Sequence, residues 1–179
     1  MSLPKFHIDG HIFYITTVVY GRQHVFDRPS FIIPLYDSLA FYRHKLDIKI
    51  LGYVFMPDHM HLLLWPQQAE NITAFMRDFK EFTAKRIVRQ AKVEKRDDLL
   101  NTFRLAGEAT GRAIHKVWQD DFWEVNVFTE RFLRQKLNYI HRNPVRAGIV
   151  TEPSDYPYSS FRNYEIGDES LMEIDRGWM

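Results

Sequence analysis

The chain has 179 residues, a formal net charge of +1, 45% hydrophobic and 15% aromatic residues, and no cysteine. This length and hydrophobic content predict one globular domain, and the lack of cysteine excludes disulfides, thiolate metal sites and cysteine nucleophiles. The sequence contains no apolar run of membrane-spanning length and no signal-peptide pattern at its N-terminus, so we expect a cytoplasmic protein without membrane contact.

The charges are segregated along the chain. Residues 72–118 carry 11 Lys or Arg against 6 Asp or Glu, and residues 129–148 carry 5 against 1. Residues 119–128 carry three acidic residues and no basic one, and residues 151–179 carry 2 basic against 7 acidic residues, which together restore the balance. This segregation is typical of a basic face that binds phosphate, although the solvated faces of helices also produce it.

The first half of the chain alternates strand and helix patterns. Residues 11–20 are rich in β-branched and aromatic side chains and predict a strand. Apolar residues at helical spacing predict a helix over 31–45. Two apolar runs around a Pro-Asp turn then predict a β-hairpin with strands over 48–56 and 59–65. We expect Asn71 to cap the helix that follows.

The second half predicts a short helix over 99–105, an extended segment over 116–128 and a last helix capped by Thr129. That helix should end at or before Asn143, because a proline disfavours helical geometry in the residue before it. The order of elements predicts an α+β fold of the ferredoxin-like, split βαβ type: an antiparallel sheet with helices packed on one face. Residues 1–164 would form this domain and residues 165–179 an acidic tail, which we expect to cover the site.

Two histidines stand where the second strand of the hairpin begins. Successive side chains of a strand alternate between faces, so His59 and His61 point the same way. Side-by-side imidazoles are typical of a metal site, and a purely structural pair is the alternative interpretation.

Tyr139 and Asn143 lie four residues apart on the last predicted helix, which places the phenol and the amide on one face. Two imidazoles and an amide oxygen can hold a metal ion, and a tyrosine hydroxyl beside them makes a coherent site for phosphodiester chemistry. The alternative is that Tyr139 is a half-buried core tyrosine.

Three segments carry a resemblance to a known family: MPDHMHLLLW (56–65), YIHRNPVRAGIV (139–150) and YPYSSF (156–161). In this order and spacing they resemble the single-tyrosine HUH transposases, most closely the REP-associated tyrosine transposase branch. The resemblance implies a transposase and endonuclease that cleaves and rejoins single-stranded DNA at hairpins of palindromic repeats. The intermediate would be a 5′-phosphotyrosine.

The resemblance also implies the roles of individual residues. Tyr139 would be the catalytic nucleophile, and His59, His61 and Asn143 would bind Mg²⁺ or Mn²⁺. The protein would be a monomer or a homodimer. Basic helix positions are the candidates for gripping DNA phosphates; these are Lys80, Lys85, Arg86, Arg89, Arg142 and Arg146.

Two other functions stay open on the sequence alone. One is a regulator that binds nucleic-acid hairpins without cleaving them. The other is a metal-dependent phosphoesterase acting on RNA, although a second His-x-Thr or His-x-Ser motif, which two-histidine phosphoesterases need, is absent from the sequence.

Overall fold

A computed structural model of the chain describes residues 11–111 and 113–177. It contains one four-stranded antiparallel sheet in the order β2-β3-β1-β4. The strands are β1 (Ile12–Val18), β2 (Ile48–Met56), β3 (His59–Pro66) and β4 (Trp123–Val127). The α-helices are α1 (Pro29–Lys45), α2 (Asn71–Val93), α3 (Asp97–Thr110), α4 (Glu130–Arg146) and α5 (Phe161–Glu165). This order of strands and helices confirms the predicted α+β, split βαβ fold.

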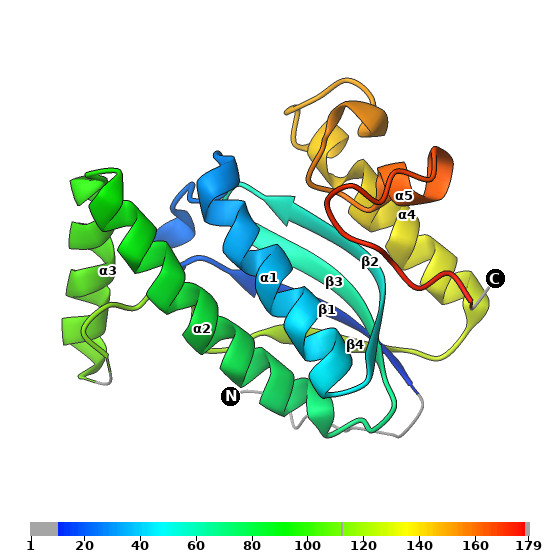
Figure 1. Ribbon diagram of the computed structural model, residues 1–179, viewed down its shortest axis with the longest axis horizontal. Helices are drawn as coiled ribbons and strands as arrows, with labels where there is room; N and C mark the ends of the chain where they lie inside the picture. Colours follow the sequence, from blue (N-terminus) through cyan, green and yellow to red (C-terminus); the bar gives the residue numbers. More distant parts are fainter. Residues whose placement is uncertain (1–10, 112, 178–179) are drawn as a thin grey trace.

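Helices cover both faces of the sheet, so the prediction that they pack on one face was wrong. Helices α1 and α2 lie on one face, and α4 lies on the other (Figure 1). The reason is visible along β1, where Phe13 and Ile15 enter the α1–α2 core while Tyr14 enters the α4 core. A strand that is apolar on both faces needs a cover on each side.

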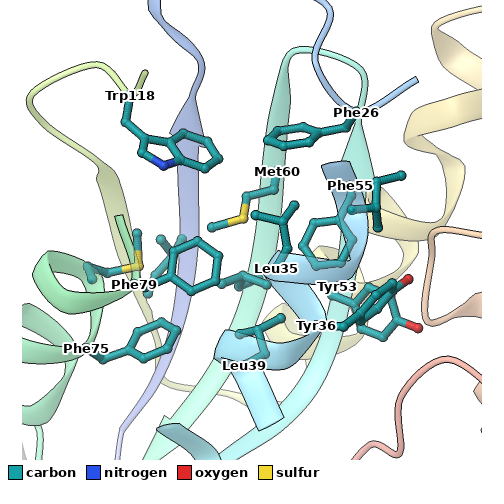
Figure 2. Packing of buried hydrophobic residues seen from close by; sticks show 14 of the residues in the cluster. Phe26, Leu35, Tyr36, Leu39, Tyr53, Phe55, Met60, Phe75, Phe79 and Trp118 are labelled. Carbon is teal, nitrogen blue, oxygen red and sulfur yellow. The ribbon is translucent and has the colours of Figure 1, made fainter. Parts of the chain in front are cut away.

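The larger core lies between the sheet, α1 and α2 (Figure 2). Its aromatic side chains pack edge to face or tilted, with 5.0 Å between the rings of Tyr36 and Phe55 and 5.6 Å between those of Phe26 and Trp118. The indole of Trp118 also donates a hydrogen bond of 3.0 Å to Thr83 Oγ1 on α2. These contacts fix the loop before β4 against α2.

Gly52 lets α4 approach the opposite face closely. A Cβ atom added at Gly52 would lie 2.7 Å from Cδ1 of Leu137 on α4. Leu137 belongs to the smaller core with Leu51, Val54 and Leu63. The missing side chain on β2 therefore sets how near α4, which carries Tyr139, lies to the sheet.

The chain after α4 covers the outer edge of β2. Ser159 forms an isolated bridge with Val54, and the backbone N–H of Asp175 donates to Ile50 O at 2.8 Å. Asp175 also accepts hydrogen bonds from the Ile50 N–H and from Arg43 on α1. An edge strand covered in this way has few free backbone groups left for pairing with another chain.

The described part of the acidic tail, residues 165–177, packs away from the histidine pair. Asp175 lies beside Ile50, which pairs with Leu64, whereas His59 pairs with Met56 at the other end of the hairpin. The expectation that the tail covers the site was therefore wrong for these residues. Residues 1–10, 112 and 178–179, which the predicted domain and tail include, lie outside the described part.

Two element boundaries differ from the prediction. Helix α2 begins at Asn71 itself, whose side-chain amide donates to Leu46 O at 3.0 Å, and Glu70 is the residue before the helix. Helix α3 is longer than the predicted 99–105 and includes Gly107, where an added Cβ atom would lie 2.3 Å from the carbonyl oxygen of Ala113. None of the helices in the described part is both long and apolar enough to cross a membrane.

Candidate active site

The histidine pair begins β3 and faces α4. The ring centroids of His59 and His61 lie 5.0 Å apart, as expected for side chains two positions apart on one strand. On the neighbouring strand β1, Val18 pairs with His59 and Thr16 pairs with His61. The register therefore places β1 side chains directly beside both imidazoles.

His61 is held on one ring nitrogen by two hydroxyl groups. Its Nδ1 lies 2.8 Å from Tyr14 Oη and 2.7 Å from Thr16 Oγ1. Its Nε2 is buried and has no hydrogen-bond partner in the described part of the chain. Burial, with smaller contributions from His59 and Lys136, lowers the pKa of His61 to about 3. His61 is therefore a neutral imidazole at physiological pH.

His59 is held on the same ring nitrogen by a carboxylate. Its Nδ1 lies 2.5 Å from Asp58 Oδ1, and Arg22 donates to the other Asp58 oxygen at 3.0 Å. Burial raises the pKa of Asp58, but the hydrogen bonds from His59 and Arg22 outweigh it, so the pKa lies below its ordinary value. An ionised Asp58 accepts a hydrogen bond from the Nδ1–H of His59. In the neutral imidazole, this tautomer has its lone pair on Nε2.

Tyr139 projects from α4 toward the histidine pair. Its ring centroid lies 5.5 Å from that of His61 and 6.2 Å from that of Tyr14. The side chain is 37% exposed, so the hydroxyl can meet a substrate from solvent. The Arg146 guanidinium lies 5.2 Å from the centre of the Tyr139 ring. The structure thus brings Tyr139 to His61, and a solely structural role in the core does not explain this exposed position.

Asn143 follows Tyr139 by one helical turn and is buried. The prediction that the helix ends at or before Asn143 was wrong, because α4 continues through Pro144 to Arg146. Pro144 stands only two residues before the helix end, and its carbonyl oxygen still accepts a hydrogen bond of 3.0 Å from Ile149 N–H. Asn143 therefore lies within the helix and its side chain is buried, whereas a position at the end of the helix was expected.

The predicted DNA-binding residues fall into two groups. Arg142 and Arg146 are exposed on α4, the helix that carries Tyr139. The four others lie on α2, across the sheet from the histidine pair; these are Lys80, Lys85, Arg86 and Arg89. Lys80 donates to the carbonyl oxygens of residues 119 and 120 at 2.5 and 2.9 Å, and Lys85 pairs with Glu81. Contact of the α2 group with DNA stays a prediction.

A third histidine, His141, lies on α4 two residues after Tyr139. It is buried, and its Nε2 lies 2.9 Å from Ser160 Oγ. Burial lowers its pKa to about 4. Ser160 in turn accepts a hydrogen bond from the Tyr53 N–H, so this histidine joins α4 to the covered edge of β2.

The donor set at the histidine pair fits a divalent metal ion. His61 Nε2 is a buried nitrogen without a protein partner, and both histidines already carry an outer partner on Nδ1, as metal-binding histidines do. In the described ranges, no group of three or more His, Cys, Asp or Glu side chains is arranged so that it could hold a metal ion by itself. The amide of Asn143, water or phosphate oxygens would have to complete the coordination.

Sequence reasoning missed four residues that contact the site. Tyr14 and Thr16 lie far from the HMH segment in sequence, and only the β1–β3 register reveals them. Asp58 is adjacent to His59 and could have been identified as its partner, since carboxylates commonly orient histidines. Lys136 lies on α4, with its Nζ 4.4 Å from the centre of the Tyr14 ring.

Several known proteins are similar in sequence to this chain. The model of the IS200-like transposase family matches residues 7–106. The REP-associated tyrosine transposase of Escherichia coli (strain K12) is 26% identical over 164 residues, which cover 88% of this chain and 80% of the relative. A Haemophilus influenzae protein, named as an inferred REP-associated tyrosine transposase, is 35% identical over 108 residues, 59% of this chain. The match spans 54% of that relative's length.

A solved structure has the same fold. It is that of a REP-associated tyrosine transposase bound to a REP hairpin, with a TM-score of 0.65, 21% identity and 98% coverage of both chains. Because the family model matches more than half of the residues, this chain belongs to the IS200-like transposase family.

Proposed function

We propose that this chain is a tyrosine transposase that cleaves and rejoins single-stranded DNA at hairpin sites. Tyr139 is the nucleophile, and His59, His61 and Asn143 bind Mg²⁺ or Mn²⁺. One observation carries the proposal: the Tyr139 ring lies 5.5 Å from His61, whose Nε2 is buried without a partner. The IS200-like family is generally metal-dependent, which agrees with a metal at this position.

The reaction replaces one phosphodiester bond by another. The Tyr139 oxygen forms a bond to the scissile phosphorus and loses its proton to solvent, and the bond from phosphorus to the 3′ oxygen breaks. The 3′ oxygen takes a proton and leaves as a free hydroxyl. The bond energy is kept in the 5′-phosphotyrosine, so the reverse attack by a 3′ hydroxyl can rejoin strands without hydrolysis.

The residues around Tyr139 suit this step. A bound divalent ion supplies positive charge that polarises the phosphate and stabilises the leaving oxygen, and neutral His and Asn ligands leave that charge intact. Arg146 lies against the Tyr139 ring, where its guanidinium can pair with a phosphate oxygen of the bound strand. Partial exposure of Tyr139 leaves the phenol open to that strand.

The substrate is proposed from the relatives. The solved REP-associated tyrosine transposase is bound to a REP hairpin, and we propose a hairpin with single-stranded flanks as the substrate here. Arg142 and Arg146 lie on the helix of the nucleophile and would contact phosphates near the scissile bond. We further propose residues 1–164 as the catalytic unit, 165–179 as its tail and the cytoplasm as its location, with the protein a monomer or homodimer.

The test uses a hairpin oligonucleotide with single-stranded flanks, labelled at its 3′ end. The protein is incubated with this DNA and Mg²⁺ or Mn²⁺, and the products are separated on a denaturing protein gel. The proposal predicts a labelled protein–DNA adduct that requires the metal and is absent with Tyr139→Phe. Hairpin binding without an adduct would indicate a regulator. Release of a free 5′ phosphate without an adduct would indicate a phosphoesterase.

A further inference from the structure

We propose that the hydroxyl groups of Tyr14 and Thr16, here called the hydroxyl pair, position His61 by accepting a hydrogen bond from its Nδ1–H, so that Nε2 presents its lone pair to the metal. This inference rests on the proposed function, because it concerns how one ligand of the proposed metal site is prepared. Tyr14 and Thr16 are positioning residues and do not themselves touch substrate in this account.

The positions of the hydroxyl pair are fixed by the sheet. Thr16 is the direct cross-strand neighbour of His61, and Tyr14 lies two positions along β1 on the same face. Both oxygens lie within hydrogen-bond distance of one nitrogen, at 2.7 Å for Thr16 and 2.8 Å for Tyr14. The Tyr14 ring is buried and stacks on the imidazole at an interplanar angle of 20°. The imidazole therefore has little freedom to rotate.

The burial of Nε2 decides between the two neutral tautomers. If Nδ1 accepted a hydrogen bond from the hydroxyl pair, Nε2 would carry a buried N–H donor without an acceptor in the described part of the chain. Buried N–H groups without partners are rarer in proteins than acceptors with an unused lone pair. The tautomer protonated on Nδ1 has no N–H group on Nε2, and either hydroxyl oxygen can accept a hydrogen bond from its Nδ1–H.

The two histidines are thus held by different chemical groups. An ionised carboxylate can only accept hydrogen bonds, so Asp58 accepts from the Nδ1–H of His59. A hydroxyl can both donate and accept, so the hydroxyl pair holds His61 without a negative charge beside the metal. We infer that His61 depends on two weak partners where His59 depends on one strong partner.

The variants remove hydroxyl groups while keeping side-chain shape. Tyr14→Phe keeps the ring that stacks on His61 and whose centroid lies 6.2 Å from that of Tyr139. Thr16→Val keeps the branched shape of the threonine side chain. The matched control is Tyr36→Phe, which removes another buried tyrosine hydroxyl from the core on the opposite face of the sheet. Far-ultraviolet circular dichroism and urea unfolding establish that each variant is folded.

Two readouts test the proposal without measuring cleavage. The first is the affinity for Mn²⁺, measured by electron paramagnetic resonance. We expect the Tyr14→Phe/Thr16→Val double variant to bind Mn²⁺ about 10- to 100-fold more weakly than the wild type. Each single variant should lose less, because one hydroxyl remains. The second is the ¹⁵N chemical shifts of His61 in metal-free protein, which we expect to show the proton on Nδ1 in the wild type and redistributed toward Nε2 in the double variant.

A rescue variant covers the case in which the double variant does not fold. Thr16→Ser in the Tyr14→Phe background keeps one hydroxyl and should bind Mn²⁺ as tightly as Tyr14→Phe alone. If the double variant binds Mn²⁺ as tightly as the wild type and keeps the His61 proton on the same nitrogen, the positioning role is wrong. The metal site itself would not be affected by that result. A wild type that binds no Mn²⁺, with or without hairpin DNA, would overturn the proposed metal site itself.

Discussion

The ring of His61 on β3 lies 5.5 Å from the ring of Tyr139 on α4, although two helices and a strand separate these elements in the chain. The contact exists because α4 crosses to the face of the sheet opposite α1 and α2. On that face the alternation of β3 presents both histidines, and Gly52 lets α4 come close. The site is therefore formed by the meeting of a strand face and a helix face.

Loss of either histidine should weaken metal binding. We expect His59→Ala and His61→Ala each to reduce Mn²⁺ affinity by more than about tenfold, since a direct ligand contributes at least as much as an outer partner. Isothermal titration of Mn²⁺ into each protein measures this. His44→Ala is the control, because His44 is exposed on α1 across the sheet. Equal affinities for all four proteins would exclude these histidines as ligands.

The role of Asn143 can be separated from its helical position. Asn143→Ala removes the amide oxygen, and we expect weaker Mn²⁺ binding with an unchanged helical circular dichroism signal. Asn143→Gln keeps an amide oxygen on a side chain one methylene longer and should retain more affinity than Asn143→Ala. If the alanine variant binds Mn²⁺ like the wild type, the third ligand is water or phosphate.

The two groups of basic residues should differ in their effect on DNA binding. For the double variant Arg142→Ala/Arg146→Ala we expect a weaker affinity for single-stranded hairpin DNA. The slope of log K against log salt should fall by about 0.7 for each phosphate that the variant no longer neutralises. The comparison is Arg86→Ala/Arg89→Ala on α2, which carries the same charge change on the opposite face. An effect confined to the α2 variant would place the DNA across the sheet from Tyr139.

Acid should destabilise the fold through its buried histidines. The pKa of His141 is lowered to about 4 by burial, whereas an unfolded histidine has a pKa of about 6.5. Between these values the unfolded chain binds a proton that the folded chain does not. As the pH is lowered from about 6.5 to about 4, the free energy of unfolding should therefore decrease by about 1.4 kcal/mol per pH unit for one histidine.

The variant His141→Gln isolates this contribution. It should be less stable near neutral pH, because the hydrogen bond with Ser160 is altered, but should lose less stability between about pH 6.5 and pH 4. Urea unfolding of both proteins over this range measures the difference. Parallel stability curves would mean that His141 does not titrate on unfolding in this window.

The sequence predicted the hairpin well because its patterns are local. Expected strands over 48–56 and 59–65 compare with Ile48–Met56 and His59–Pro66, and the Pro-Asp turn lies between them. Thr129 was expected to cap α4, and its hydroxyl does accept the Phe132 N–H at 3.2 Å. Each of these features depends on residues within a few positions of one another.

The errors concern the ends of helices and the contacts between elements that are distant in the chain. The helix expected over 99–105 is longer at both ends and runs from Asp97 to Thr110. Asn143 was expected at the helix end because Pro144 follows it, but α4 continues through Pro144 to Arg146. The partners of His61 depend on the register of β1 with β3, which no local pattern reveals.

Mapping the covalent adduct on the protein identifies the nucleophile. Protein incubated with hairpin DNA and Mn²⁺ is digested with nuclease and trypsin, and the modified peptide is sequenced by mass spectrometry. We expect a nucleotide linked through its 5′ phosphate to Tyr139, within the tryptic peptide 137–142. We expect no modification of Tyr14, which lies beside Tyr139. An adduct on any other residue would contradict the assignment of the nucleophile, and cleaved DNA with a free 5′ phosphate and no adduct would contradict the mechanism.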